Sequence, residues 1–102
     1  SGGQQKLLEL ARVLMLDPAI IILDEPFAGV HPRLQETIYK YIYRVHEEGK
    51  AIMLISHDMN AVFELSQRLV VLNFGAVIAD GKPEEVRRDP VVIESYLGEE
   101  EE

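Results

Sequence analysis

The sequence contains no cysteine, which excludes disulfide bonds and metal sites built from thiolates. It also lacks long apolar runs: the longest, such as residues 19–23, have the length of a β-strand and are too short to cross a membrane as a helix. Positive charge is scarce, since 10 Lys and Arg residues stand against 18 Asp and Glu residues, for a net charge of −8. Without a basic stripe we expect no direct binding to nucleic acid, because such binding depends on contacts with many phosphates.

What the chain does contain fits one small globular domain. Its 102 residues lie near the usual size of a domain, and 47% of them are hydrophobic, which favours a folded core over disorder. The four glutamates at 99–102 carry half of the net negative charge. We interpret this run as an acidic tail, which leaves residues 1–98 for the domain itself.

Hydrophobic periodicity predicts strands that alternate with helices. The pattern predicts helices over 1–16, 32–48, 58–66, 83–88 and 90–97, and strands over 19–23, 51–55, 68–72 and 76–79. The first two strands are apolar throughout, which is typical of parallel strands buried on both faces. The last two flank Asn73, Phe74 and Gly75 and form a predicted antiparallel hairpin. The sequence therefore predicts an α/β fold with parallel strands and a late hairpin.

The helix expected over 32–48 has an apolar side and clear ends. Pro32 suits its first turn, and Gly49 suits a cap beyond its last turn. The residues predicted to face the core are Leu34, Ile38, Tyr41, Ile42 and Val45.

The chain opens with a segment suited to binding an anion. Ser1, Gly2, Gly3 and Gln4 lead into the first predicted helix. Glycines let the backbone approach an anion closely, and the start of a helix carries partial positive charge. The alternative is a glycine-rich stub ahead of an ordinary helix.

Ionisable side chains follow both of the predicted parallel strands. Asp24 and Glu25 come after the strand at 19–23, and His57 comes after the strand at 51–55. The carboxyl ends of parallel strands are where α/β sheets bind ligands. Of two carboxylates there, one can face a metal-bound phosphate and the other an attacking water. The alternatives are that Asp24 caps the next turn, that Glu25 is solvated, and that His57 is an ordinary surface residue.

Together these segments resemble the second half of an ABC-type ATPase domain. The signature motif of that family is similar to Ser1-Gly2-Gly3-Gln4-Gln5, its Walker B strand to Ile20-Ile21-Ile22-Leu23-Asp24-Glu25-Pro26, and its switch-histidine segment to Ser56-His57-Asp58. The resemblance covers residues 1–98 and implies a partial P-loop NTPase fold. The phosphate-loop strand of that fold is absent, because the chain contains no G-x-x-x-x-G-K-[ST] motif.

The resemblance implies a role for each of these residues. Glu25 would be the general base that polarises the attacking water, and His57 would hydrogen-bond the γ-phosphate of ATP. Asp24 would help to hold Mg²⁺ through its water shell. The residues that would contact ATP bound to the opposite subunit of a dimer are Ser1, Gly2, Gly3 and Gln4.

A further stretch is similar to the D-loop of the family, which crosses the dimer interface. Its residues are Ala28, Gly29, Val30 and His31. The family usually has Asp or Asn where this chain has His31, so the interface contact differs at this position. A histidine can still hydrogen-bond across a dimer, with a dependence on pH.

Within the family, the chain is most similar to the ATPases of branched-chain amino acid importers. The similarity lies in residues 27–30, 57–59 and 92–98. It implies an ATP-hydrolysing subunit placed peripherally on the cytoplasmic face of the membrane. Its partners would be a second ATPase subunit in a homo- or heterodimer, transmembrane permease subunits and a substrate-binding protein. A related loop and ending occur in lipopolysaccharide-export ATPases, which remain an alternative.

The missing phosphate loop leaves further interpretations open. We expect the chain to be part of a longer protein and to hydrolyse no ATP by itself. We also expect it to be marginally stable alone, because the family's phosphate-loop strand normally separates the strand at 51–55 from the strand at 68–72. The alternatives are a short protein that regulates an ATPase, a soluble ABC-type protein without a membrane partner, and a catalytically silent binding module.

Overall fold

The computed structural model describes residues 2–97, which divide into two compact units. The first unit ends at Leu65 and the second begins at Ser66. Each unit contains one two-stranded sheet, and among the described residues no strand of one sheet pairs with a strand of the other. The acidic tail expected at 99–102 lies outside the described residues. Within residues 2–97, none of the helices combines the length and the apolar character that a membrane span requires.

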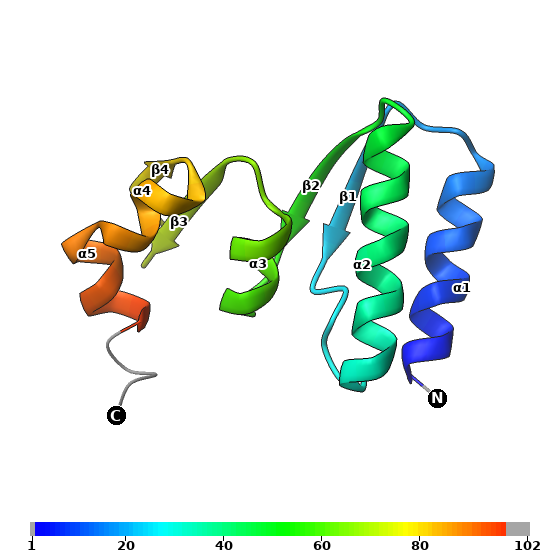
Figure 1. Ribbon diagram of the computed structural model, residues 1–102, viewed down its shortest axis with the longest axis horizontal. Helices are drawn as coiled ribbons and strands as arrows, with labels where there is room; N and C mark the ends of the chain where they lie inside the picture. Colours follow the sequence, from blue (N-terminus) through cyan, green and yellow to red (C-terminus); the bar gives the residue numbers. More distant parts are fainter. Residues whose placement is uncertain (1, 98–102) are drawn as a thin grey trace. The chain divides into compact units, whose positions relative to one another are not determined.

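The first unit is a β-α-β arrangement with one helix before it and one after it (Figure 1). Its elements in chain order are α1 (Gly2–Met15), β1 (Ile20–Asp24), α2 (Pro32–Glu47), β2 (Ala51–Ile55) and α3 (Met59–Leu65). The two strands are parallel and in register, so that Ile20 lies opposite Ala51 and Asp24 lies opposite Ile55. The carboxyl ends of both strands therefore meet at one edge of the sheet.

Local sequence signals account for where the helices begin and end. The turn after α1 passes through Asp17, whose φ of 50° is left-handed, and Pro18 follows it. Pro32 occupies the first turn of α2, where its missing N–H costs nothing. Gly49, with a φ of 94°, follows the end of α2 in the left-handed conformation that a glycine adopts most readily.

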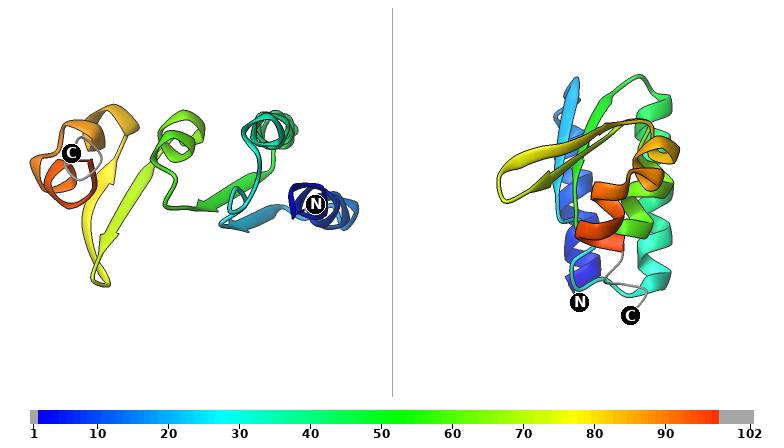
Figure 2. Two further views of the ribbon diagram at one scale, coloured as in Figure 1. Left: turned by 90° about the horizontal axis from the view of Figure 1, so that it is seen from below. Right: turned by 90° about the vertical axis from the view of Figure 1, so that its left-hand side faces the viewer.

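The core of the first unit forms where α2 and α3 cover one face of the β1–β2 sheet (Figure 2). Its buried members are Phe27, Val30, Ile38, Ile42 and Ala61. The rings of Phe27 and Tyr39 meet edge to face, with centroids 5.1 Å apart. Phe27 and Val30 thereby anchor the loop that follows β1 to the core, while Ala28 and Gly29 between them are exposed.

The expectation that Tyr41 faces the core was wrong. Its side chain is 41% exposed, whereas the buried residues of α2 are Ile38, Ile42 and Val45. Tyr41 lies at the margin of that buried stripe, because the helical period places it about 60° away from Ile38. It lines an apolar groove of about 290 Å³, whose other lining residues are Leu7, Leu10, Ala11, Leu14 and Met15 of α1.

The expectation that the first two strands are buried on both faces was also wrong for the described residues. Ile21 faces the helices and is 3% exposed, but its neighbours Ile20 and Ile22 are 65% and 63% exposed. Met53 and Ile55 of β2 are exposed as well. Alternate residues of a strand point to opposite faces, and α2 and α3 cover only one of them.

The second unit is an antiparallel hairpin followed by short helices. Its elements are β3 (Leu69–Asn73), β4 (Ala76–Gly81), α4 (Pro83–Arg88), α5 (Pro90–Val92) and the π-helical turn η1 (Ile93–Leu97). Phe74 and Gly75 form the hairpin turn with φ values of 50° and 78°, as a turn that follows the twist of the strands requires. Leu69, Val86 and Val92 are its buried apolar residues. Two short helical segments thus occupy the stretch predicted to be one helix over 90–97.

Candidate functional site

The candidate site lies at the shared carboxyl edge of β1 and β2 and centres on Glu25. The Glu25 N–H donates to the carbonyl of Ile55 at 2.7 Å, which extends the pairing of the two strands by one bond. Its φ is 50°, a left-handed conformation that costs about 1–3 kcal/mol in a residue other than glycine. Its carbonyl accepts hydrogen bonds from Ala28 N at 3.3 Å and from Lys6 Nζ at 2.8 Å. The main chain of Glu25 is therefore held from three sides.

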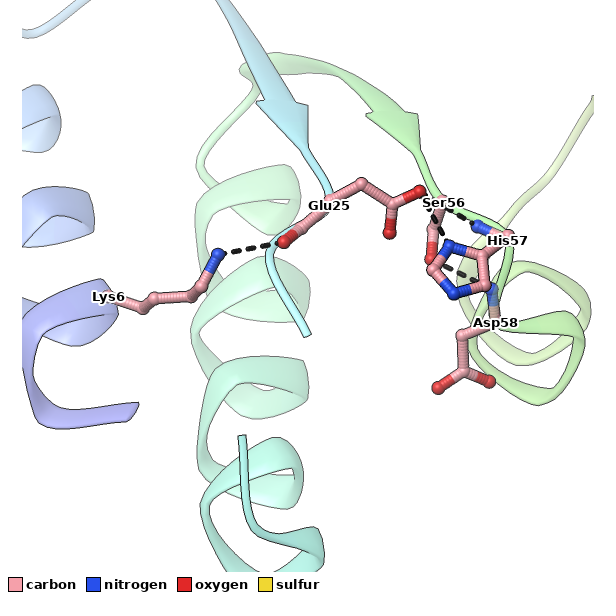
Figure 3. Close-up of polar contacts among 5 residues, drawn as sticks. All are labelled: Lys6, Glu25, Ser56, His57 and Asp58. Atoms are coloured by element: carbon pink, nitrogen blue, oxygen red, sulfur yellow. Dashed lines mark hydrogen bonds and ion pairs between the residues drawn. The ribbon is translucent and has the colours of Figure 1, made fainter. Parts of the chain in front are cut away.

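The carboxylate of Glu25 is directed at His57, as Figure 3 shows. Glu25 Oε1 lies 3.2 Å from the main-chain N and 2.8 Å from the ring Nδ1 of His57. The hydrogen bond and the negative charge of Glu25 raise the pKa of His57, and the charge of Asp58 adds to this. The imidazole is 83% exposed while the carboxylate is 35% exposed, so the pair opens toward solvent.

Asp58 and Ser56 cap the start of α3. Asp58 Oδ1 accepts a hydrogen bond from Ala61 N at 3.1 Å, as an N-cap does, and Ser56 Oγ accepts one from Asp58 N at 3.0 Å. In Figure 3 the Asp58 carboxylate points away from Glu25. Ser56, His57 and Asp58 thus form no catalytic triad, and this capped turn fixes His57 at the sheet edge.

Asp24 ends β1 on the face of the sheet that the helices leave open. It lies opposite Ile55 in the register, and it is exposed. No cluster of three or more Asp, Glu or His side chains suited to a metal ion occurs among residues 2–97. One exposed carboxylate fits the way Mg²⁺ is usually held beside a nucleotide, by one or two carboxylates, water and the phosphates. Asp24 alone does not make a metal site.

The glycine-rich start of α1 has two different environments. Gly2 and Gln4 are exposed, whereas Gly3 is buried. A Cβ atom at Gly3 would overlap the end of the Leu34 side chain, so glycine lets α1 lie close to α2 without moving that side chain. Ser1 lies outside the described residues. Packing is thus an independent reason for the glycine at position 3.

The stretch expected to be the D-loop joins the core to the start of α2. Ala28 and Gly29 are exposed, and Gly29 has a φ of 70°. Val30 is buried in the core. His31 is the N-cap of α2, and its Nδ1 accepts a hydrogen bond from Arg33 N at 3.2 Å. The imidazole thus caps the helix, as the side chain of Asp or Asn commonly does.

Lys6 is the one residue of the site that the sequence did not reveal. It lies in the middle of a helical pattern, where an isolated lysine usually marks a solvated position. Its contact spans 19 positions along the chain, so only the folding of the unit, in which α1 packs against α2, brings its amine to Glu25. No local pattern in the sequence indicates that contact.

Two family models match the chain, and each covers a different part. Residues 1–63 match a family described as "AAA domain, putative AbiEii toxin, Type IV TA system". Residues 76–102 match the family "Branched-chain amino acid ATP-binding cassette transporter". The first match covers more than half of the chain.

Three curated relatives are named as ATP-binding proteins of branched-chain amino acid transport. The chain is 45% identical to BraF of Pseudomonas aeruginosa over 98 residues, which cover 95% of this chain and 38% of BraF. It is 41% identical to LivG of Escherichia coli over 98 residues, covering 95% of this chain and 38% of LivG. It is 39% identical to a probable LivG of Archaeoglobus fulgidus, covering 96% of this chain and 38% of that protein. The chain thus spans about two-fifths of the length of these relatives.

Solved structures of ATP-binding cassettes have the same arrangement of elements. The ADP conformation of an ATP-binding cassette of an ABC transporter superposes with a TM-score of 0.83 at 37% identity, covering 96% of this chain and 40% of that one. A nucleotide-free cassette gives a TM-score of 0.84 at 36% identity, covering 92% of this chain and 39% of that one. These likenesses confirm the predicted α/β fold. The chain belongs to the ATP-binding cassette family and, within it, is similar to the ATP-binding proteins of branched-chain amino acid transport.

Proposed function

We propose that this chain is part of the ATP-binding and ATP-hydrolysing subunit of an ABC transporter that drives the uptake of branched-chain amino acids. One observation carries the catalytic part of the proposal: Glu25 and His57 pair across the carboxyl edge of two parallel strands, at 2.8 Å. The edge is where α/β sheets place catalytic groups. The names of the relatives support the transported substrate.

In the proposed reaction, Glu25 acts on water and His57 acts on phosphate. The Glu25 carboxylate accepts a hydrogen bond from the attacking water, which raises the electron density on the water oxygen, and it takes up the proton as that oxygen bonds to the γ-phosphorus and the bond to the leaving ADP oxygen breaks. With Nδ1 bound to Glu25, the imidazole of His57 has Nε2 for the γ-phosphate. Contact with Glu25 raises the pKa of His57, which favours the protonated ring that a phosphate oxygen binds best.

ATP and Mg²⁺ are the expected cofactors. Mg²⁺, held by the phosphates and through water by Asp24, would neutralise charge that develops on the phosphoryl group. Gly2 and Gln4, with Ser1 and Gly3, would present the start of α1 to ATP bound by a second subunit. The D-loop residues Ala28, Gly29, Val30 and His31 would lie at the interface between the two subunits.

The remaining parts of the proposal concern the whole protein. Residues 1–98 would form the C-terminal part of an ATPase domain, with 99–102 as an acidic tail. The domain would lie on the cytoplasmic face of the membrane, bound to transmembrane permease subunits that receive substrate from a binding protein. Two such domains, alike or different, would close on ATP. The chain alone would hydrolyse none, since the phosphate cradle of this family is a P-loop, which this sequence does not contain.

A substitution that removes the charge of Glu25 tests the catalytic part in the intact protein. Glu25→Gln should bind ATP as the unchanged protein does and lower kcat about 10²-fold or more, because an amide is a poor general base. Glu36→Gln is the matched control, since Glu36 is an exposed glutamate on α2 outside the site. ATP hydrolysis and binding of a fluorescent ATP analogue are measured on all three proteins. Near-normal turnover in Glu25→Gln would rule out Glu25 as the base.

Reconstitution tests the transport part. The intact protein, its permease subunits and its binding protein are placed in liposomes, and the uptake of labelled leucine is followed with and without ATP. Uptake that needs ATP and fails with Glu25→Gln is the expected result. ATP hydrolysis that no branched-chain amino acid stimulates would favour another substrate, such as the lipopolysaccharide of the export ATPases named as an alternative above.

A further inference from the structure

Lys6 makes a contact that the proposed mechanism leaves without a purpose. Its Nζ donates a hydrogen bond of 2.8 Å to the main-chain carbonyl of Glu25, and the contact is partly buried. Figure 3 shows Lys6 on one side of Glu25 and His57 on the other. We infer that Lys6 is a positioning residue: it holds the main chain of Glu25 so that the carboxylate meets His57. The inference rests on the proposed function of Glu25 for its catalytic consequence, though not for its geometry.

The main chain of Glu25 needs such support. Its φ of 50° is unfavourable for a residue that carries a Cβ atom. The N–H is fixed by the carbonyl of Ile55 at 2.7 Å, but on the other side the carbonyl of Glu25 has only a long bond of 3.3 Å from Ala28 N within the loop. A hydrogen bond from a charged amine is shorter and stronger than one between neutral groups. Lys6 therefore supplies the firmest contact to this carbonyl.

The position of the peptide decides where the carboxylate goes. Glu25 Oε1 lies within hydrogen-bond distance of two nitrogens of His57, the main-chain N at 3.2 Å and Nδ1 at 2.8 Å. Both hydrogen bonds from His57 to Oε1 form only when the Cα–Cβ bond of Glu25 points toward His57. If the Glu25 peptide rotates toward a right-handed conformation, the Cα–Cβ bond turns with it and Oε1 leaves His57. Removal of the Lys6 amine therefore displaces the Glu25 carboxylate, although the Glu25 side chain itself is unchanged.

The place of Lys6 in α1 gives the contact a second consequence. Lys6 follows Gly2 by four positions, which is about one helical turn, so both lie on the same side of α1. Under the proposed function, the start of α1 touches ATP held by the partner subunit, whereas Glu25 acts on ATP held by its own subunit. Lys6 then links the helix that contacts one ATP to the base that acts on the other.

ATP hydrolysis by the intact protein tests the inference with four proteins. Lys6→Met keeps most of the stem and removes the donor, and kcat should fall at least about tenfold while KM for ATP changes less than about twofold. Lys6→Arg keeps a charged donor and should restore most of kcat. Lys40→Met makes the same change at an exposed site on α2 and should leave both constants as they are. Should Lys6→Met fold poorly, Lys6→Gln, whose amide stops short of the carbonyl, takes its place.

An NMR titration of the His57 imidazole gives a readout that needs no hydrolysis. Glu25 raises the pKa of His57 in the unchanged protein. In Lys6→Met the displaced carboxylate should let this pKa return toward its ordinary value, whereas in Lys40→Met and Lys6→Arg it should stay raised. If the His57 pKa stays raised in Lys6→Met, the inference is overturned. This holds when kcat is normal, and it also holds when kcat falls together with the melting temperature. An intact protein that hydrolyses no ATP would overturn the proposed function, and the titration would still decide the role of Lys6.

Discussion

The two units of the chain differ in what they carry. In the described residues, the first unit contains Glu25 and His57, which pair at the carboxyl edge of β1 and β2, together with the other candidate site residues. The second unit is a hairpin with short helices and contains none of them. The family matches divide in the same way, since the AAA model ends at residue 63 and the branched-chain transporter model begins at residue 76.

Under the proposed function, this division separates the residues for ATP hydrolysis from the part that resembles one class of transporter. A β-α-β unit that places a carboxylate and a histidine at one sheet edge can serve any ATPase of this kind, whatever the energy is used for. The described part of the second unit contains none of the candidate site residues, yet residues 76–102 match the model named for one class of transporter. We therefore expect substitutions in the first unit to change ATP hydrolysis and those in the second unit to change stability with little change in chemistry.

The largest effect should come from the core of the first unit. Ile38 is 2% exposed and packs with Phe27 and Val30, which belong to the loop just after Glu25. Ile38→Ala should lower the free energy of unfolding by about 2–5 kcal/mol, because it removes buried methyl groups and leaves a cavity. It should also lower kcat, since the loop that follows Glu25 loses its support. Urea unfolding and ATP hydrolysis of the intact protein measure both.

Ile38→Val is the graded control for this prediction. It should cost only about 0.5–1.5 kcal/mol and leave hydrolysis nearly unchanged. A fully active Ile38→Ala protein with lowered stability would show that the loop does not depend on this part of the core.

A smaller effect should come from the core of the second unit. Val92 is 1% exposed, and Val92→Ala should cost about 2 kcal/mol, because two buried methyl groups are lost and a small cavity remains. Hydrogen exchange should become faster within Leu69–Leu97 and kcat should stay unchanged. Val91→Ala, at a side chain that is 49% exposed, should be nearly neutral. A large loss of kcat in Val92→Ala would contradict the expectation that the second unit affects stability and not hydrolysis.

The sequence was sufficient for the elements and for the edge where the site lies. The apolar run at Ala51–Ile55 became β2 with the predicted bounds, because periodicity and turn residues act locally. Parallel strands have their carboxyl ends at one edge, so Glu25 and His57 were expected at the same edge of the sheet, although their hydrogen bond was not predicted. The catalytic roles of both residues stay predictions until they are measured.

The rest could not be read from the sequence because it depends on contacts between distant segments. The left-handed φ of Glu25 has no local signal, and its support by Lys6 arises only when α1 packs against α2 in the folded unit. The pattern of Ile20 and Ile22 fits burial on both faces, and only the placement of α2 and α3 shows which face they cover. Gly3 was predicted to serve a phosphate, while its contact with Leu34 also serves packing.

The smallest effects should come from one exposed ion pair in each unit, and their pH dependences have opposite signs. Contact with Glu25 raises the pKa of His57 above 6.5, so this pair stabilises the fold fully below that pH and is lost as pH rises through the raised value. Contact with Arg68 lowers the pKa of Asp80 below 3.8, so that pair is present above this pH and is lost as pH falls through the lowered value. One pair titrates near neutrality and the other only in acid.

Stability measured against pH can therefore assign a small loss near neutrality to the first unit. In acid, hydrogen exchange is needed to locate the loss, because Lys50 also lowers the pKa of Asp17 in the first unit. Between about pH 6 and 8, the intact protein should lose a little stability in the first unit, and His57→Gln should remove this slope. Asp80→Asn should leave that window unchanged and flatten only the decline below about pH 4, in the second unit. Hydrogen exchange at each pH locates the loss. If Asp80→Asn altered the slope near neutrality, the two units would be coupled through charge, and a change in the hairpin could then reach the histidine beside Glu25.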